Sequence, residues 1–297
     1  RNVANYIWRP SRMLRDIRQL RQRMRNVDLV ANDSFHPALL VLGLLPRGRR
    51  KIVHVYGVSL RVAVERNFHE RLPAWIAGIF RRIIHWQIES ARARIEHDFT
   101  YDQLQEYARA SYRLPTPVAV VTAAATENTS VAASATAAVY LNPHFRETAL
   151  VEGLEAGMRD AQLSTYCVGE GYAHREGWLA QDTRWVEKAI SSDLILSAPG
   201  MATLSIALIY DKPILLVLTD QPEQAANAQR AAEFGLRHAV VVWRADTLDF
   251  RRQIALAVTC LLNTPGRQTS AQGEALAAAR LDLWIKLLMD LALKPGK

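Results

Sequence analysis

Apolar runs and helical periodicities alternate along the first part of the chain. Residues 27–31 and 52–56 form two apolar runs that predict strands, and the apolar segment 38–45 between them predicts a helix. A strand, a helix and a second strand of this length predict a βαβ unit, and therefore a parallel sheet. From Pro73 onward, apolar residues at helical spacing predict a long helix that ends at about Glu96.

The second half of the chain repeats this alternation after Pro115 and Pro117, which mark a boundary on either side of Thr116. Strands are predicted at 118–122, 139–142, 163–168, 193–197, 213–218 and 239–243. Helices are predicted at 147–159, 185–191, 200–210, 223–234 and 250–262, with the Ala-, Thr- and Ser-rich segment 123–138 as a weak helix. Such an alternation is typical of a doubly wound sheet. Two such halves predict a two-lobed α/β protein with a cleft between its lobes.

The length of the chain, 297 residues, indicates two domains at about 150 residues per domain. We expect residues 1–115 to form an N-terminal lobe and residues 116–275 to form a C-terminal lobe. Residues 276–297 are predicted to form a terminal helix, because they carry an apolar stripe at helical spacing: Leu281, Leu283, Trp284, Leu287, Leu288 and Leu291. Because the chain begins at Arg1 inside a predicted helix, we expect the N-terminal lobe to be truncated.

Composition and charge narrow the class of protein. A hydrophobic content of 49 % is ordinary for a globular protein, and Cys167 and Cys260 are too few for a disulfide scaffold, which favours a reducing, cytoplasmic compartment. Residues 1–115 contain 21 Lys and Arg against 10 Asp and Glu, a net charge of +11, whereas residues 116–297 contain 16 against 19, a net charge of −3. The basic half indicates an anionic partner, such as nucleic acid, phospholipid headgroups or a phosphorylated metabolite. No nucleic-acid-binding motif is present, so we expect no nucleic-acid partner.

The most informative stretch is a predicted buried strand that ends at Ser197 and turns at Gly200 directly into a helix. Free backbone N–H groups in the first turn of that helix, which contains Met201 and Thr203, form a site for an anion together with the helix dipole. Gly200 lacks the Cβ atom that would keep a phosphate away. The alternative is an ordinary connection between a strand and a helix.

Polar residues also follow the next predicted strand, 213–218. Asp220 and Gln221 lie at its carboxyl end, and Gln224 and Asn227 lie in the first turns of the following helix. Acceptors and amide donors in this arrangement suit the recognition of several hydroxyl groups on one sugar. The alternative is capping of the helix by Asp220 or Thr219, which explains one polar residue but not four.

The segment 191–236 resembles the donor-binding half of the GT-B glycosyltransferases, in particular the peptidoglycan-type N-acetylglucosaminyltransferases and the UDP-sugar transferases that share their C-terminal domain. The shared motifs are a Ser-x-x-Gly turn, here Ser197 and Gly200, and an Asp-Gln-x-x-Gln-x-x-Asn segment, here 220–227. The resemblance covers about 178–262, extends to 139–177 in pattern only, and is architectural for 1–115. It implies two Rossmann-like lobes, with the diphosphate of a nucleotide sugar at the turn and the sugar beside the Asp-Gln segment. In such relatives the last helix often crosses back to the N-terminal lobe, so we expect residues 278–292 to contact that lobe.

The resemblance also implies an activity, which is transfer of a hexose-type sugar from a nucleotide sugar, UDP-linked by expectation, to an acceptor hydroxyl. Helix-end dipoles would stabilise the leaving diphosphate, and no cofactor or metal is expected. Three departures from the family leave an alternative open. Ile206 stands where relatives usually have an acidic residue for the ribose, residues 141–144 hold no Gly-rich loop, and the first N-terminal strand is absent. The alternative is a non-catalytic relative that binds a nucleotide sugar or a partner. A third hypothesis is a nucleotide-sugar epimerase on the same fold, but the paired acidic residues that usually follow the turn in such enzymes are not visible in this sequence.

Candidates for a catalytic base are weaker. Asp33 and His36 follow the predicted strand 27–31, and a histidine paired with a carboxylate deprotonates a hydroxyl. The alternative is that Asp33 or Ser34 caps a helix while His36 is an ordinary surface residue. No His or Cys spacing matches a metal site.

The helix from Trp75 to Trp86 carries Ile76, Ile79, Phe80, Ile83 and Ile84 beside Arg81 and Arg82. This pattern is typical of an interfacial helix on an anionic membrane, and it favours a peripheral location at the inner face of the membrane with a lipid-linked acceptor. The alternative is that the apolar face packs into the core while the arginines are solvated.

Overall fold

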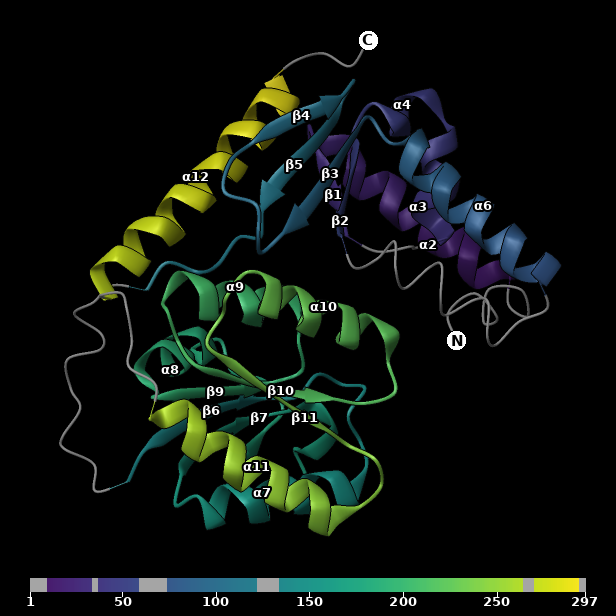
Figure 1. Ribbon diagram of the computed structural model, residues 1–297. Helices are drawn as coiled ribbons and strands as arrows, with labels where there is room; N and C mark the ends of the chain where they lie inside the picture. Colours follow the sequence, from purple (N-terminus) through teal and green to yellow (C-terminus); the bar gives the residue numbers. More distant parts are fainter. Residues whose placement is uncertain (1–9, 34–36, 59–73, 122–133, 264–269, 294–297) are drawn as a thin grey trace. The chain divides into compact units, whose positions relative to one another are not determined.

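The computed structural model describes residues 10–33, 37–58, 74–121, 134–263 and 270–293 (Figure 1). The chain divides into two compact units: unit 1 combines Arg1–Pro115 with Asp282–Lys297, and unit 2 is Thr116–Leu281. The last helix, α12 (Ser270–Leu293), belongs to unit 2 as far as Leu281 and to unit 1 from Asp282 onward. The division after Pro115 falls where two prolines flank Thr116.

Unit 1 is built on a five-stranded sheet in the order β1-β2-β3-β5-β4. The strands β1 (Val30–Asn32), β2 (Ile52–Gly57), β3 (Ala93–Asp98) and β5 (Ser111–Pro115) are parallel, and β4 (Gln105–Ala108) is antiparallel to β5. The helices are α2 (Pro10–Arg23), α3 (Pro37–Leu44), α4 (Pro46–Arg49) and α6 (Ala74–Ser90), and the short helix η1 (Met24–Asn26) follows α2.

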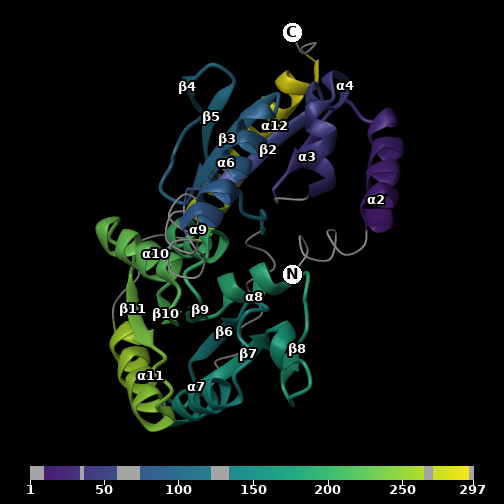
Figure 2. The same cartoon turned by 90° about the vertical axis from the view of Figure 1, so that its right-hand side faces the viewer.

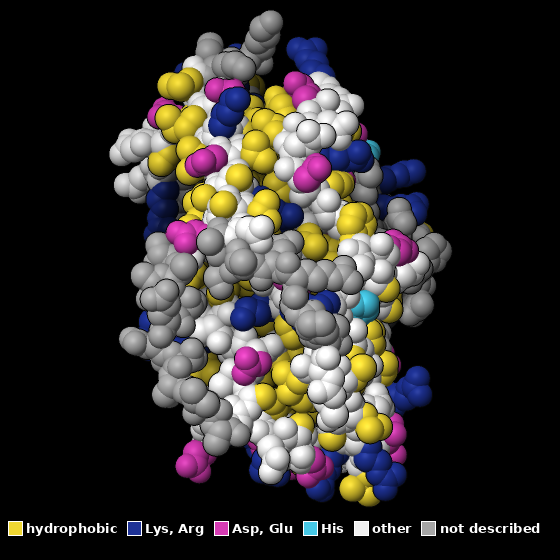
Figure 3. Space-filling model, turned by 60° about the vertical axis from the view of Figure 1, so that its left-hand side comes forward, with side chains coloured by type: hydrophobic (Ala, Val, Ile, Leu, Met, Phe, Trp, Pro, Cys, Tyr) yellow, Lys and Arg dark blue, Asp and Glu magenta, His cyan; other side chains and the backbone are white. Residues whose placement is uncertain are grey.

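Helices cover both faces of this sheet (Figure 2). On one face α12 buries Trp284, Leu287 and Leu291 against residues of β2, β3 and β5, such as Val53 and Ile95. On the other face a second cluster joins α2, η1 and α3 to β2. The far side of α12 exposes apolar side chains (Figure 3): Leu281, Ile285, Met289 and Leu293 are between 37 % and 76 % exposed.

The predicted helix to Glu96 is wrong at its end, because α6 stops at Ser90 and residues 93–98 form β3. β3 alternates small or apolar residues with charged ones. Its Glu96 is 2 % exposed, and its carboxylate accepts hydrogen bonds from Tyr101 Oη (2.7 Å) and Arg113 Nε (3.0 Å). A strand whose buried polar groups are paired lacks the apolar run that identifies a buried strand. The hairpin β4–β5 was not predicted either.

Unit 2 is built on a six-stranded parallel sheet in the order β11-β10-β9-β6-β7-β8. The strands are β6 (Thr136–Tyr140), β7 (Ser164–Val168), β8 (Trp178–Leu179), β9 (Leu194–Ser197), β10 (Ile214–Leu218) and β11 (His238–Val242). The helices are α7 (Thr148–Asp160), α8 (Trp185–Ser191), α9 (Met201–Ile209), α10 (Pro222–Glu233) and α11 (Thr247–Leu262), with the short helix η3 (Glu170–Tyr172) after β7. In Figure 1, α7 and α11 lie on one face of the sheet, and α8, α9 and α10 lie on the other.

Burial on both faces explains why β9 and β10 were predicted within one residue. Every residue of β9 and β10 is buried, so both strands appear as apolar runs. Two predictions were wrong. The described residues 118–121 form no strand, and residues 136–138 of the predicted weak helix belong to β6, where they pair with β7 and β9. Residues 122–133 of that predicted helix lie outside the described residues.

Candidate functional site

The order of the strands in unit 2 creates a switch point between β6 and β9. The chain continues from β6 to β7 and β8 on one side, whereas β9, β10 and β11 lie on the other side. In open parallel sheets, ligands bind outside the carboxyl ends of the strands at such a point. The turns that follow β9 and β10 therefore lie where a ligand is expected.

The turn after β9 leaves the first turn of α9 open. Ser197 ends the strand and is 1 % exposed. Gly200 is the N-cap residue, with φ −87° and ψ 152°, and no side chain caps the helix. A Cβ atom at Gly200 would meet Thr203 Oγ1 at 3.7 Å and the Ala198 carbonyl oxygen at 4.0 Å, which are ordinary contacts. Neither the backbone nor the packing therefore requires glycine here, and its effect is to keep the space before the helix end open to an anion.

Thr203 and Met201 of this motif are bonded within the chain. The hydroxyl of Thr203, which is 4 % exposed, lies 3.2 Å from the Ala198 carbonyl oxygen and 3.0 Å from that of Gly200. Met201 is half-buried, and its carbonyl accepts a hydrogen bond from Ser205 Oγ (2.8 Å). Thr203 thus fixes the path of the turn through its side chain.

The polar residues of α10 connect the two turns. Asn227 Nδ2 donates a hydrogen bond to the Pro199 carbonyl (2.8 Å), so α10 is tied to the turn that precedes α9. Gln224 Oε1 accepts hydrogen bonds from the backbone N–H of Thr219 (2.6 Å) and from its hydroxyl (3.1 Å). The segments that follow β9 and β10 therefore form one polar site.

Three buried polar atoms at this site have no hydrogen-bond partner within the described part of the chain: Ser197 Oγ, Gln224 Nε2 and Asn227 Oδ1. Ser197, Gln224 and Asn227 are 1 %, 5 % and 2 % exposed. A buried polar atom without a partner costs about 1–3 kcal/mol, and such atoms are rare in folded proteins. One hydroxyl, one amide donor and one amide acceptor together match a ligand that carries both acceptor and donor groups.

The capping alternative for Asp220 is wrong. The N-cap residue of α10 is Gln221, and no side chain caps the helix. Asp220 is exposed and Gln221 is half-buried at the carboxyl edge of the sheet.

Positions at which the sequence departs from the expected motif lie elsewhere. Ile206 is 2 % exposed inside α9, so its side chain belongs to the core. After β6, the Asn142 side chain accepts a hydrogen bond from the backbone N–H of His144 (3.0 Å), which forms a turn in place of a Gly-rich loop.

In unit 1, Asp33 is exposed directly after β1, at the carboxyl edge of its sheet. His36 lies outside the described residues. His54 on β2 is 1 % exposed, and its Nδ1 lies 3.4 Å from Asn32 Nδ2. Burial lowers the pKa of His54 to about 4 against the opposing charge of Asp33, so the ring is neutral at pH 7. His54 is a packed histidine of the sheet.

The amphipathic helix α6 does not bury its whole apolar face. Trp75, Ile79, Ile83 and Trp86 are 69 %, 48 %, 40 % and 42 % exposed, whereas Ala77 and Gln87 are buried. Among the described residues, the apolar face of α6 is therefore only partly buried.

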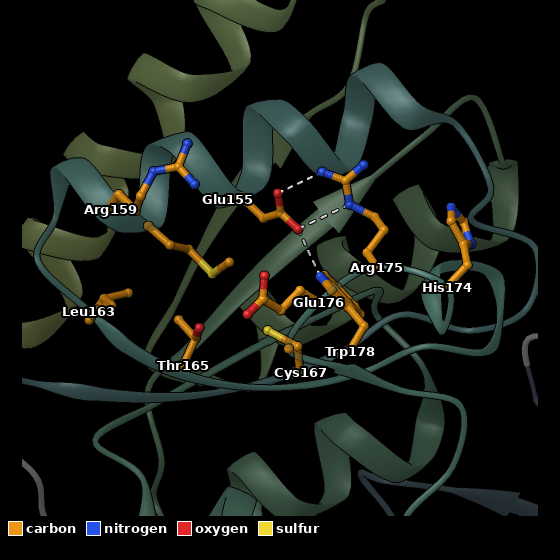
Figure 4. A pocket seen from close by; sticks show the side chains of 11 residues that line it. Glu155, Arg159, Leu163, Thr165, Cys167, His174, Arg175, Glu176 and Trp178 are labelled. Carbon is orange, nitrogen blue, oxygen red and sulfur yellow. Dashed lines mark hydrogen bonds and ion pairs between the residues drawn. The ribbon is translucent and has the colours of Figure 1, made fainter.

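A cavity of about 630 Å³ lies in unit 2 beneath α7, beside β7 and β8 (Figure 4), and the sequence did not indicate it. Its main feature is Glu155, which accepts hydrogen bonds from Arg175 Nη2 (2.9 Å) and Trp178 Nε1 (2.9 Å). Burial opposes the charge of Glu155, but the bonds from Arg175 and Trp178 outweigh it and lower the pKa of the carboxyl group. Burial raises the pKa of Cys167 to about 11, so the thiol stays protonated. These paired groups hold the loop before β8 in place.

Two further findings concern the described residues as a whole. Among them, no group of three His, Cys, Asp or Glu side chains is placed to hold a metal ion. None of their helices combines the length and the apolarity that crossing a membrane requires.

No protein-family model and no curated protein matches the sequence. Several solved structures are similar in fold. The glycosyltransferase of kitacinnamycin is 14 % identical with a TM-score of 0.56, and the match covers 95 % of this chain and 80 % of that one. LpCGTa in complex with UDP is 12 % identical with a TM-score of 0.55, at coverages of 94 % and 80 %. Spinosyn rhamnosyltransferase SpnG is 14 % identical with a TM-score of 0.53, at coverages of 95 % and 77 %.

At these identities the likeness concerns the fold. The chain has the two-sheet α/β fold of the GT-B glycosyltransferases, as the resemblance of residues 178–262 predicted.

Proposed function

We propose that the chain binds a nucleotide sugar at the carboxyl edge of the sheet of unit 2 and transfers its hexose to an acceptor hydroxyl. The observation that carries this proposal is the set of three buried, unpartnered polar atoms beside the uncapped end of α9. One of the similar folds, LpCGTa, was solved in complex with UDP. UDP is therefore the first nucleotide to test.

The roles of the residues follow from their positions. The backbone N–H groups of the turn 197–203 bind the diphosphate, because a helix N-terminus attracts anions and Gly200 leaves them room. Ser197 Oγ adds one hydroxyl, and Thr203 and Met201 shape the turn. The hexose lies beside Asp220, Gln221, Gln224 and Asn227, whose acceptors and amides suit sugar hydroxyls. As the bond to the anomeric carbon breaks, the same helix end stabilises the developing charge of the nucleoside diphosphate.

The acceptor belongs to unit 1 in this proposal. Among the residues that the structure describes, Asp33 at the carboxyl edge of its sheet is the candidate for deprotonating the acceptor hydroxyl. His36, outside the described residues, is a second candidate. A non-catalytic relative that binds the nucleotide sugar without turnover is the rival, and the buried Ile206 favours it. Binding of the donor without release of the nucleoside diphosphate would identify this rival.

The experiment that tests donor binding uses Ser197→Ala. In the wild-type chain the hydroxyl is buried and has no partner among the described residues, so its removal leaves the free energy of unfolding unchanged or raises it. If the hydroxyl binds the donor, the affinity for UDP and UDP-hexoses measured by calorimetry falls about tenfold. Ser205→Ala is the matched control, because this serine is also buried but bonds Met201 within α9. Equal affinities of wild type and Ser197→Ala, or no binding of any UDP- or TDP-sugar by the wild type, would refute the site.

We extend the proposal to a peripheral contact with anionic membranes through α6. Trp75, Ile79, Ile83 and Trp86 form an exposed face within one arc of the helix, and Arg82 borders that arc. Cosedimentation with vesicles of phosphatidylcholine and phosphatidylglycerol should fall strongly for Trp75→Ser/Trp86→Ser. Leu256→Ser, which removes a 73 % exposed side chain from α11, is the control and should bind like the wild type. Equal vesicle binding of all three chains would exclude α6 from such a contact.

A further inference from the structure

A second cavity, of about 680 Å³, lies in unit 1 at the amino end of β2. The ends of α2 and α3 come together there with α4 (Figure 2), and the lining residues are Arg21, Met24, Arg25, Leu42, Leu45, Pro46, Arg47, Gly48, Arg50 and Lys51. Gly48 fixes this arrangement, since a Cβ atom at this position would lie 2.1 Å from the Leu42 carbonyl oxygen. Only glycine allows α4 to pack so closely on the end of α3.

The charge of the lining is entirely positive. Four arginines and Lys51 line the cavity, and no lining residue is acidic. Lys51 Nζ donates hydrogen bonds to the backbone carbonyls of Met24 (2.9 Å), Arg25 (3.3 Å) and Val27 (2.7 Å), so its charge is held in place. The exposed guanidinium groups of Arg21, Arg25, Arg47 and Arg50 have no carboxylate partner among the described residues. Like charges gathered in one cavity repel each other, and a bound anion removes that repulsion.

The floor of the same cavity is apolar. Met24 and Leu42 are 7 % and 2 % exposed, and Leu45, at 45 % exposed, borders the cavity beside Pro46. A volume of this size is typical of sites for small molecules. An inorganic anion would bind the cationic side chains and leave this apolar surface exposed to water.

We propose that this cavity binds a phosphorylated amphiphile, in which a phosphate or diphosphate is joined to a hydrocarbon chain. Planar guanidinium groups match phosphate oxygens in two-pronged hydrogen bonds, and the hydrocarbon covers the surface formed by Leu42, Leu45 and Pro46. The cavity lies at the amino end of β2, whereas Asp33 follows the carboxyl end of β1, and the two strands are parallel. The site is therefore separate from the proposed acceptor position and does not depend on the proposed function.

The first test distinguishes the possible sources of the phosphate. The full chain is titrated by calorimetry with dihexanoyl phosphatidic acid below its micelle concentration, with inorganic phosphate, with pyrophosphate and with dihexanoyl phosphatidylcholine. We expect phosphatidic acid to bind at least about tenfold more tightly than the other three, because it alone offers a doubly charged phosphate with acyl chains. Equal affinity for inorganic phosphate or pyrophosphate would overturn the amphiphile and assign the cavity to a small anion. Equal affinity for phosphatidylcholine would overturn the role of the arginines.

The second test locates the binding. Arg47→Ala/Arg50→Ala should weaken phosphatidic acid binding about tenfold or more, whereas Arg12→Ala/Arg18→Ala, which removes two exposed charges from α2 outside the cavity, should leave it within about twofold. Leu45→Asn should weaken phosphatidic acid but not inorganic phosphate. This side chain is already half exposed, so the fold of the variant is preserved and the test stands even if the double variant is unstable. Equal losses in the two arginine variants, or unchanged affinity in Leu45→Asn, would overturn the assignment.

Discussion

Filling the space in front of α9 is the most direct perturbation of the proposed donor site. Gly200→Val places two methyl groups at the N-cap position, beside the backbone N–H groups of Met201 and Ala202. The backbone accepts this change, because φ is −87° and a Cβ atom meets nothing closer than 3.7 Å. The cost to folding is therefore that of a poor N-cap residue, about 1 kcal/mol. For a unit of this size, this cost lowers the melting temperature by about 2–4 °C.

The expected loss of binding is much larger than this loss of stability. A hydrogen bond from a backbone N–H group to a charged phosphate contributes about 1.5–3 kcal/mol. If the valine side chain displaces the diphosphate from two such groups, the affinity for UDP falls by about 3–6 kcal/mol, which is at least a hundredfold. Gly200→Ala adds only the Cβ atom, so its affinity should lie between that of the valine variant and that of the wild type.

Calorimetric titration of UDP into the three chains measures this series, with circular dichroism melts to verify that each chain is folded. The reasoning requires that affinity fall in the order Gly, Ala, Val while the melting temperatures stay within a few degrees. A folded Gly200→Val chain that binds UDP within about threefold of the wild type would exclude this turn as the diphosphate site.

The other predictions concern the sugar, the last helix and a buried histidine. Gln221→Ala should weaken binding of a UDP-hexose more than binding of UDP, because the proposed site places this side chain beside the hexose only; equal losses in calorimetry would place it elsewhere. Trp284→Ala should reduce the free energy of unfolding by about 3–5 kcal/mol in urea, since Trp284 is 8 % exposed and donates a hydrogen bond to Pro115 (2.7 Å). Ile285→Ala, which truncates a 51 % exposed side chain, should cost less than about 1 kcal/mol, and similar costs would contradict this packing. The pKa of His54 falls from 6.5 unfolded to about 4 folded, so its contribution to stability is present above pH 6.5 and is lost as the pH falls toward 4. Urea unfolding at several pH values measures this effect. Between about pH 7 and pH 4, the free energy of unfolding of the wild type should fall by roughly 3 kcal/mol more than that of His54→Asn, at about 1.4 kcal/mol per unit of pKa.

How well the sequence predicts the fold depends on how each strand satisfies its polar groups. β10 reads Ile-Leu-Leu-Val-Leu because both faces of the sheet are covered, and its limits follow from the apolar run. β3 buries two polar residues, Glu96 and Asp98, and the partners of Glu96 are Tyr101 and Arg113, which only the folded chain brings near. Such pairing leaves no periodic pattern, so the segment was predicted as helix.

The candidate site was predicted from motif and position, but its internal bonding was not. The sequence places Ser197 and Gly200 on a turn and Asn227 on a following helix. It does not show that Asn227 bonds Pro199, or that the hydroxyl of Thr203 serves the turn. The same limit applies to the basic cavity of unit 1. The basic segment 46–51 is evident as a charge run, whereas the sequence does not show that the distant Met24 completes an apolar floor with the neighbouring Leu42 and Leu45.

In the proposed function, binding and turnover are physically separable, and each depends on residues of a different unit. Ser197, Gln224 and Asn227 each bury a polar atom without a described partner, at about 1–3 kcal/mol per atom in the free protein. A ligand that forms hydrogen bonds with these atoms recovers this energy whether or not a reaction follows. Both hypotheses, the glycosyltransferase and the non-catalytic relative, therefore require tight binding by unit 2. Ile206 is buried in α9 and adds nothing to that binding. Turnover additionally needs a base, and Asp33 of unit 1 is the candidate among the residues that the structure describes. The catalytic hypothesis would therefore be established if the wild type releases the nucleoside diphosphate while Asp33→Asn retains donor affinity and releases none. A wild type that binds the donor without releasing the nucleoside diphosphate would establish the non-catalytic hypothesis.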